Sequence, residues 1–111
     1  MKEKSPIKAI KDIILNYKEC KRFIAYTEHG INILHDSTNL SNEIGVRKKY
    51  VFNFECSLAL LDDKLRDIFQ KDLDSEDTYW YIGTMSRSTY YRHREKACEQ
   101  FMKNFKRLEN L

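Results

Sequence analysis

The residues from 85 to 96 carry the side chains of this chain best suited to binding chemistry. Arginines and a lysine alternate there with serines and tyrosines. Arginine donates paired hydrogen bonds to guanine edges and to phosphates, and small hydroxyl side chains bond to either at close range. Ser86 is a good N-cap residue, so the pattern predicts a helix that begins at Arg87. With Gly83 as a turn residue, the segment is interpreted as the turn and recognition helix of a helix-turn-helix.

Positions within this predicted helix assign the roles of its side chains. Ser88, Tyr91 and Arg92 share one face at spacings of three and four residues. Together with Arg87 they would enter the major groove, where Arg92 could pair with guanine. The flanking basic residues would lie on or near the phosphate backbone. The full predicted DNA-binding set is Arg87, Ser88, Tyr91, Arg92, Arg94, Lys96 and Lys103.

The charge distribution is uneven although the net charge of +3 and the pI of about 8.7 are only mildly basic. Residues 86–107 contain seven Lys or Arg against two Glu, whereas residues 55–78 contain eight Asp or Glu against three Lys or Arg. A basic end beside an acidic middle is typical of a protein with one nucleic-acid-facing end. A basic solvent-facing surface on the last helix of a bundle is the alternative.

Catalytic and metal-binding patterns are missing from the sequence. The histidines His29, His35 and His93 are scattered, and no glycine-rich phosphate loop or Ser-His-Asp order occurs. The cysteines form no CxxC pair and lie on or beside apolar stripes, which favours buried reduced thiols over a zinc site. The acidic clusters at 62–63 and 72–77 have the spacing of solvent-facing charges and helix caps. We therefore expect no enzyme activity, no metal and no cofactor.

Helical spacing dominates the chain, which has one proline and three glycines. We expect a single domain over 1–111. Ser5-Pro6 marks a helix start, and an apolar face predicts a long helix over 6–28. Residues 31–34 could form a short strand or an anchored loop, followed by a turn at 36–39 and a cap at 41–42. The apolar face of the first helix is formed by Ile7, Ile10, Ile14 and Tyr17.

A regular apolar seam predicts a second long helix over 46–72. Its residues recur at spacings of three and four, as expected for an amphipathic helix that packs on the first. Dimerisation through this face is an open alternative. The seam consists of Val51, Phe54, Leu58, Leu61, Leu65 and Ile68.

The rest of the chain predicts the helix-turn-helix over 76–107. Residues 78–82 would form a short first helix with Trp80 and Ile82 inward, and 87–107 the second. The predicted fold class is an all-α bundle of four to five helices with a C-terminal helix-turn-helix. The buried face of the last helix would be Tyr90, Ala97, Phe101, Phe105 and Leu108.

The motif also carries a family resemblance. The run Gly83-x-Met85-Ser86-Arg87-Ser88-Thr89-Tyr90-Tyr91-Arg92, followed by Lys96-Ala97 and Phe101, resembles the C-terminal helix-turn-helix of bacterial sigma factors. It is more similar still to the ArpU-type phage regulators. This resemblance implies promoter DNA as the ligand and allows a contact with RNA polymerase. Nothing upstream resembles a polymerase-binding sigma region, so a complete sigma factor is not implied.

The expected function is sequence-preferring binding of double-stranded DNA by a small transcriptional regulator. A homodimer is compatible with this, and the absence of a signal peptide or a long apolar run predicts a cytoplasmic protein with no membrane partner. The alternative is a non-catalytic interaction module that docks a protein through the 51–68 seam or the aromatic cluster at 79–81. Burial of the seam together with an open 87–96 face would favour DNA binding.

Overall fold

The computed structural model of the 111-residue chain describes the backbone of residues 6–30 and 38–111 and the side chains of residues 8–28 and 42–111. Within this part, four helices are found and no strand. The predicted all-α class is therefore confirmed. The helices are α1 (Pro6–Gly30), α2 (Thr38–Ala59), α3 (Asp63–Asp74) and α4 (Arg87–Glu109).

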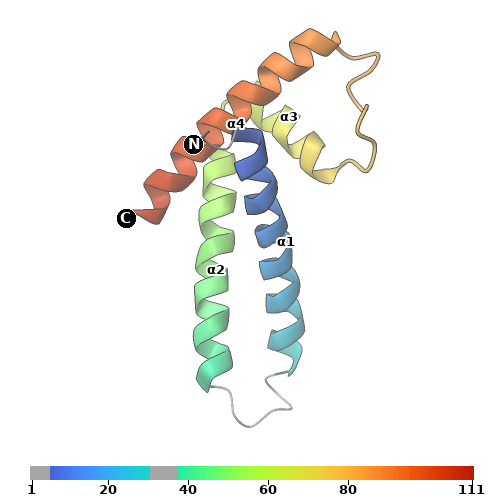
Figure 1. The fold of residues 1–111 in the computed structure, drawn as a ribbon. Helices are drawn as coiled ribbons and strands as arrows, with labels where there is room; N and C mark the ends of the chain where they lie inside the picture. The colour runs from blue at the N-terminus through green and yellow to red at the C-terminus, as the bar shows by residue number, and fades with distance from the viewer. Residues whose placement is uncertain (1–5, 31–37) are drawn as a thin grey trace.

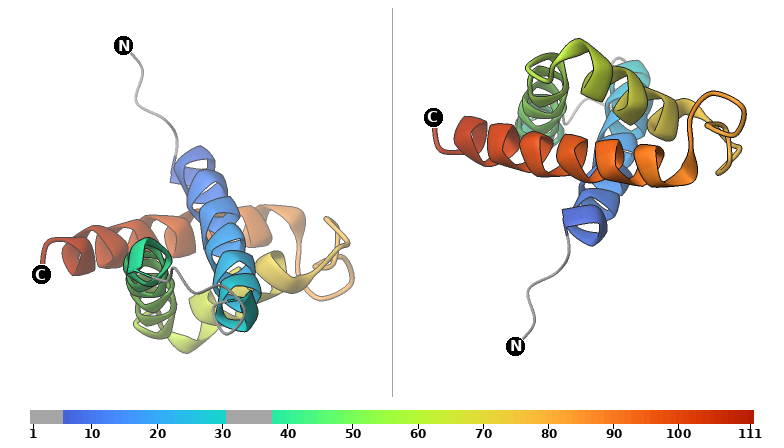
Figure 2. Two further views of the ribbon diagram at one scale, coloured as in Figure 1. Left: turned by 90° about the horizontal axis from the view of Figure 1, so that it is seen from below. Right: turned by 90° about the horizontal axis from the view of Figure 1, so that it is seen from above.

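Two helices form a hairpin, and the other two lie across one end of it. α1 and α2 run antiparallel and pack along their length, and α4 crosses the end of this hairpin where α2 ends (Figure 1). α3 lies beside α4, and the views from below and above show both of these helices spanning the hairpin (Figure 2). Because the hairpin projects away from this junction, the molecule is elongated, with extents of 55 × 31 × 29 Å.

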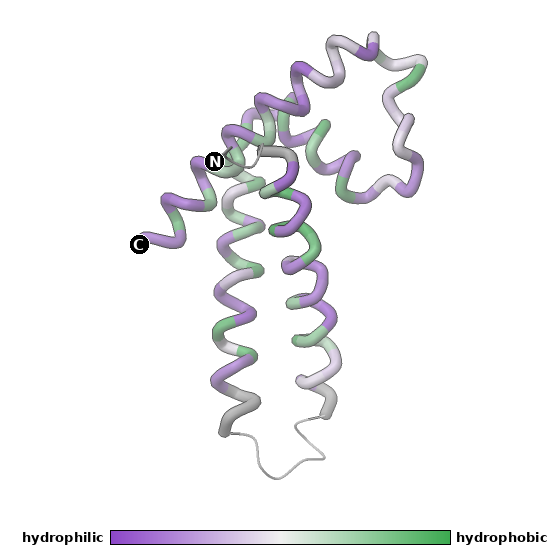
Figure 3. The backbone as a smooth tube through the Cα atoms, viewed as in Figure 1, coloured by the Kyte–Doolittle hydropathy of each residue, from purple (hydrophilic) through white to green (hydrophobic). Residues whose placement is uncertain are grey.

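α1 matches the predicted helix over 6–28 and extends it to Gly30. Pro6 is its first residue, where the ring presets a helical φ and the missing N–H costs no hydrogen bond. Ile10, Tyr17 and Cys20 are buried on the predicted face. Hydrophobic and hydrophilic residues alternate turn by turn along both hairpin helices, as an amphipathic pair requires (Figure 3).

α2 begins at Thr38, so the predicted turn at 38–39 and cap at 41–42 are wrong. Ser, Thr and Asn are weak helix formers, but packing against another helix outweighs propensity of that size. Ile44 is buried near this end of α2, which runs along α1. The predicted strand or loop at 31–34 and the cap residue Ser5 lie outside the described residues.

The prediction of one helix over 46–72 is wrong, because α2 ends at Ala59 and α3 begins at Asp63. Asp62 caps the new helix: its carboxylate accepts a hydrogen bond from the Leu65 N–H at 2.9 Å. Asp63 follows in the first turn, where a negative charge interacts favourably with the helix dipole. The adjacent Asp62 and Asp63 are therefore a helix-start signal inside an otherwise continuous apolar pattern.

The predicted seam is buried despite this break. Phe54, Leu61 and Ile68 are each at most 3% exposed, and the other seam residues pack against the core. The centre of the core is aromatic: the Phe101 ring lies 4.7 Å from that of Phe69 and 4.9 Å from that of Phe54. Because these rings belong to α2, α3 and α4, the core sits where the hairpin meets the capping helices. The seam residues thus pack against other helices of the same chain.

The predicted short helix at 78–82 is also wrong. Residues 75–86 form a loop of successive turns, with hydrogen bonds from Ile82 N to Tyr79 O and from Thr84 N to Tyr81 O. Gly83 has a φ of 88°, which confirms its predicted turn role. A helix-turn-helix joins its helices by a turn of about three to four residues. The longer loop between α3 and α4 does not have this form.

Candidate nucleic-acid interface

α4 begins where the sequence predicts. Ser86 has an extended backbone, and its hydroxyl oxygen accepts a hydrogen bond from the Thr89 N–H at 3.2 Å. The N-cap prediction is therefore confirmed, and Arg87 is the first helical residue. The first turns of α4 extend beyond the hairpin (Figure 1). They are backed by α3 and the 75–86 loop rather than by α1 and α2.

The seven predicted DNA-binding residues separate into three groups on α4. The first group lies opposite the buried face and is exposed, since positions separated by four or seven residues share one side of a helix. Hydrophilic residues predominate along α4 as a whole (Figure 3). We call this group the outer face of α4; it consists of Ser88, Arg92, Lys96 and Lys103.

Arg87 and Tyr91 form the second group, on the side of α4 next to the loop. The Arg87 guanidinium carbon lies 5.6 Å from the centroid of the Tyr91 ring, within reach of a cation–π contact. The Tyr91 ring also makes edge contacts with Tyr81 and Tyr90, at 6.3 and 5.1 Å. Both residues are exposed, but the Tyr91 ring is held against the loop.

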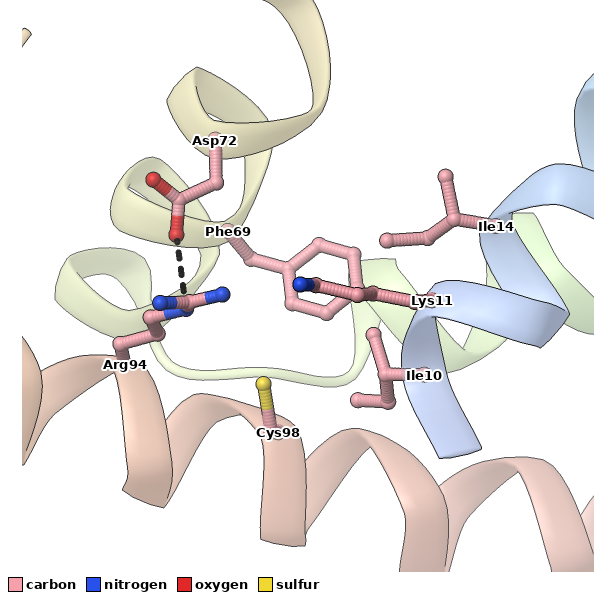
Figure 4. A pocket seen from close by; sticks show the side chains of 7 residues that line it. All are labelled: Ile10, Lys11, Ile14, Phe69, Asp72, Arg94 and Cys98. Atoms are coloured by element: carbon pink, nitrogen blue, oxygen red, sulfur yellow. Dashed lines mark ion pairs between the residues drawn. The ribbon is translucent and has the colours of Figure 1, made fainter. Parts of the chain in front are cut away.

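Arg94 is the third case, and its predicted contact with phosphate stays a prediction. Its Nε lies 3.8 Å from an Asp72 carboxylate oxygen, and its side chain is 25% exposed. Figure 4 shows both side chains at a cavity of about 150 Å³, lined also by Phe69 and Cys98. Arg94 points from α4 toward α3, so it is an internal charge partner of Asp72 rather than part of the outer face.

Asp72 has a role that the sequence pattern does not reveal. Its spacing predicts a solvent-facing or capping charge, but one carboxylate oxygen accepts hydrogen bonds from both Trp80 Nε1 and the Tyr90 hydroxyl, each at 2.6 Å. Burial, and then this bond to Asp72, raise the pKa of Tyr90 above its usual range. One signal was available: Asp72 lies four residues after the buried Ile68, on the apolar side of α3.

The loop packs through aromatic rings onto the Asp72 site. The Tyr81 ring stacks on that of Tyr90 at 3.8 Å, and the Trp80 ring meets Tyr90 edge-on at 5.6 Å. Tyr81 is 3% exposed whereas Ile82 is 68% exposed, so Tyr81 rather than the predicted Ile82 faces inward beside Trp80. The loop is therefore anchored to both α3 and α4.

The electrostatic surroundings of His93 add one more basic residue to the outer face. Partial desolvation, and then the positive charges of Lys64, Arg92 and Lys96, lower the pKa of His93. Lys64 belongs to the first turn of α3, which the sequence pattern placed within a continuous helix. The fold thus brings Lys64, together with the carboxylate of Asp62, within electrostatic range of His93 on α4.

Other chemistry is scarce in the described part of the chain. No group of three or more His, Cys, Asp or Glu residues there could hold a metal ion. Cys20 and Cys98 are buried as expected, Cys56 is half-buried, and all three are free thiols. Burial raises the pKa of the Cys98 thiol to about 11, which disfavours the reactive thiolate.

Among the described helices, none has the length and apolar character needed to span a bilayer. Comparison with known protein families, with characterised proteins and with solved structures finds no match to this chain. The resemblance to sigma factors and ArpU-type regulators therefore stays a prediction that rests on residues 83–101.

Proposed function

We propose that this protein binds double-stranded DNA through the outer face of α4, as a small transcriptional regulator. The observation that supports this most strongly is the clustering of exposed cations from two helices. The charges of Lys64, Arg92 and Lys96 all act on His93, against the opposing charge of Asp62, and Lys103 is exposed further along α4. In the described part of the chain, none of these four cations forms an ion pair with a carboxylate.

The shape of this region suits the proposal. α1, α2 and α3 all pack against α4, and the outer face lies on the side of α4 away from its buried residues. An exposed helix fits the major groove, which is about 12 Å wide. Glu99 lies on this side of α4, seven residues after Arg92 and four before Lys103, and Glu95 lies seven residues after Ser88. Because these carboxylates would repel phosphates, we expect contacts to concentrate at Ser88, Arg92 and Lys96. The proposal replaces the predicted helix-turn-helix with a helix backed by α3 and an anchored loop.

The alternative, a docking module, has less surface to use. Every residue of the 51–68 seam is buried or half-buried against the core of the same chain. In the aromatic cluster at 79–81, Tyr81 is buried and Trp80 is half-buried, which leaves Tyr79 as the exposed member. The two surfaces proposed for docking are thus mostly occupied by the protein itself.

The direct test is fluorescence anisotropy of the protein with random-sequence duplex DNA, titrated with salt. We expect binding that weakens steeply as salt rises, with a log–log slope of about −0.9 for each neutralised phosphate. Selection from a random duplex library would then identify a preferred site. A folded protein that fails to bind duplex at low salt would contradict the proposal.

Variants of the outer face locate the interface. Arg92→Ala should weaken binding to a preferred sequence more than to random duplex, because a guanine pair carries sequence discrimination of about 1–3 kcal/mol. Lys96→Ala should weaken both equally and reduce the salt slope by about 0.9. Lys49→Ala is the matched control, since Lys49 is exposed on α2. Equal losses for Lys49→Ala and Lys96→Ala would indicate nonspecific attraction and exclude the outer face as the site.

A further inference from the structure

A shallow groove runs along one face of the α1–α2 hairpin and is not explained by DNA binding. Its volume is about 380 Å³, and no residue of α3 or α4 lines it. Its centre is apolar, formed by Ile24 and Ala25 from α1 and by Val51 and Phe52 from α2. The Phe52 side chain is 65% exposed, although an aromatic ring of this size gains free energy from burial. We call this surface the hairpin groove.

The rim of the hairpin groove is charged at both ends. At the end near the core, Lys21 from α1 and Glu55 from α2 both contact Tyr17: the Lys21 Nζ lies 5.3 Å from the ring centroid, and the hydroxyl donates to Glu55 at 3.5 Å. At the other end, Glu28 from α1 and Lys48 from α2 form an ion pair between the helices. Each helix therefore carries one cation and one anion, in opposite order.

This order makes the hairpin groove complementary to itself. The two-fold axis lies in the plane of the groove, crosses its middle and runs perpendicular to the helices. Rotation about this axis places a second hairpin face to face on the first, in the antiparallel sense. Lys21 of each copy then faces Glu28 of the other, and Glu55 faces Lys48. The two Phe52 rings, midway between Lys48 and Glu55 along α2, meet near the axis.

We propose that a second copy of this chain docks in the hairpin groove, with the two hairpins antiparallel. An interface with two-fold symmetry pairs the same patch on both copies, so its charges must complement themselves, and the rim of this groove does so at all four corners. A partner with a different sequence would carry no such requirement. This inference does not depend on DNA binding.

The antiparallel sense is favoured by the charge of α4. Residues 86–107 contain seven Lys or Arg and two Glu, a formal charge of +5. Parallel hairpins would place the two copies of α4 side by side, whereas antiparallel hairpins place them at opposite ends of the dimer. Repulsion between like charges falls with distance and is screened beyond about 10 Å. The antiparallel dimer avoids most of this repulsion.

The size of the contact predicts a weak dimer. The groove spans eight residues of each helix, or about 12 Å, so a hairpin of two helices of about 10 Å diameter offers on the order of 240 Å² per copy. This is about a third of the roughly 800 Å² per partner found in standard interfaces. We therefore expect association that depends on protein concentration and that weakens at high salt.

Sedimentation velocity of the full chain over a wide concentration range tests the proposal. The wild-type protein should shift from monomer to dimer as concentration rises. Lys21→Glu should weaken the dimer about tenfold, because symmetry reverses two exposed charge pairs at once and each such pair has a modest effect. Phe52→Ala should also weaken it, through loss of the central apolar contact. Lys49→Glu makes the same charge change on α2 outside the groove and should leave the dimer unchanged.

A double reversal tests the orientation. In Lys21→Glu combined with Glu28→Lys, one end of each groove becomes acidic and the other basic, so antiparallel copies pair as well as wild type or better. In the parallel arrangement, position 21 faces Glu55 of the other copy, and the same variant would bring acidic ends together. Loss of the dimer in this variant would overturn the antiparallel proposal.

A monomer at every concentration, or equal effects of Lys21→Glu and Lys49→Glu, would overturn the groove as the interface. Circular dichroism checks that each variant is folded.

Discussion

At the scale of single residues, His93 reports on the charge of the outer face. Partial desolvation and the cations Lys64, Arg92 and Lys96 lower its pKa in the free protein below the usual value of about 6.5. The lowered pKa favours the neutral imidazole. In the absence of DNA, the lowered pKa makes the folded state less stable in acid. The contribution of His93 to stability is present above about pH 6.5 and is lost as the pH falls and His93 is protonated.

DNA binding should reverse the sign of this effect. Phosphates near Arg92 and Lys96 would offset the local positive potential and raise the pKa of His93, so binding would take up a proton. We expect the affinity for duplex DNA to rise as pH falls from about 7.5 to 5.5, up to about tenfold for each unit by which the pKa rises. Anisotropy titrations at the two pH values measure this.

His93→Asn is the control for the pH effect, because its side chain does not titrate. It should flatten the dependence of affinity on pH without abolishing binding at pH 7. If wild type and His93→Asn respond to pH in the same way, the DNA does not approach His93, and the outer face near Lys96 is not the interface.

At the scale of elements, the anchored loop determines how α4 is presented. Residues 75–86 are held by the Asp72 carboxylate, which joins Trp80 of the loop and Tyr90 of α4 to α3. The same carboxylate lies near Arg94. One side chain thus fixes the relative positions of two helices and the loop between them, and it supports the first turns of α4 where they extend beyond the hairpin.

Asp72→Ala should destabilise the protein by about 2–3 kcal/mol, because Trp80 Nε1 and the Tyr90 hydroxyl both lose a charged acceptor. Asp72→Asn keeps an acceptor oxygen but removes the charge beside Arg94, so we expect a smaller loss of about 1 kcal/mol. Urea denaturation followed by tryptophan fluorescence measures both, and Trp80 is the only tryptophan in the chain. An Asp72→Ala variant with wild-type stability and fluorescence would show that the loop is held by its ring contacts alone.

At the scale of the whole molecule, stability depends on one aromatic junction. Phe101 is 0% exposed and contacts the rings of Phe54, Phe69 and Phe105. The hairpin and the two capping helices are therefore held together around one side chain, and the far end of the hairpin adds little to this core.

Phe101→Ala should cost about 3–5 kcal/mol, the usual range for deleting a buried phenylalanine ring. A domain of this size has a total stability of about 5–15 kcal/mol, so much of the margin would be lost. Tyr26→Ala is the control: Tyr26 is 79% exposed on α1, and its removal should change stability by less than about 1 kcal/mol. Thermal melts followed by circular dichroism compare them. A loss below about 1 kcal/mol for Phe101→Ala would contradict the single-junction description.

Local sequence signals predicted most of the buried apolar faces and the starts of two helices. Periodicity identified the faces of α1 and α4, and Ser86 and Pro6 marked helix starts correctly, because capping and amphipathic spacing act over only a few residues. Periodicity identified the 51–68 seam as an apolar face even though the helix is interrupted at residues 60–62. Leu61 stays buried at this corner, so the spacing continued and concealed the break that Asp62 and Asp63 signal.

The remaining features depend on contacts between distant elements and could be read only from the folded protein. Three such features depend on how α3 packs against α4. They are whether Arg94 faces solvent or Asp72, whether Lys64 lies near the outer face, and whether residues 78–82 form a helix. Residues 80 and 81 both turn inward because Tyr90 and Asp72 provide partners from other helices. Such partners lie many residues away in sequence, where local propensity and periodicity carry no information.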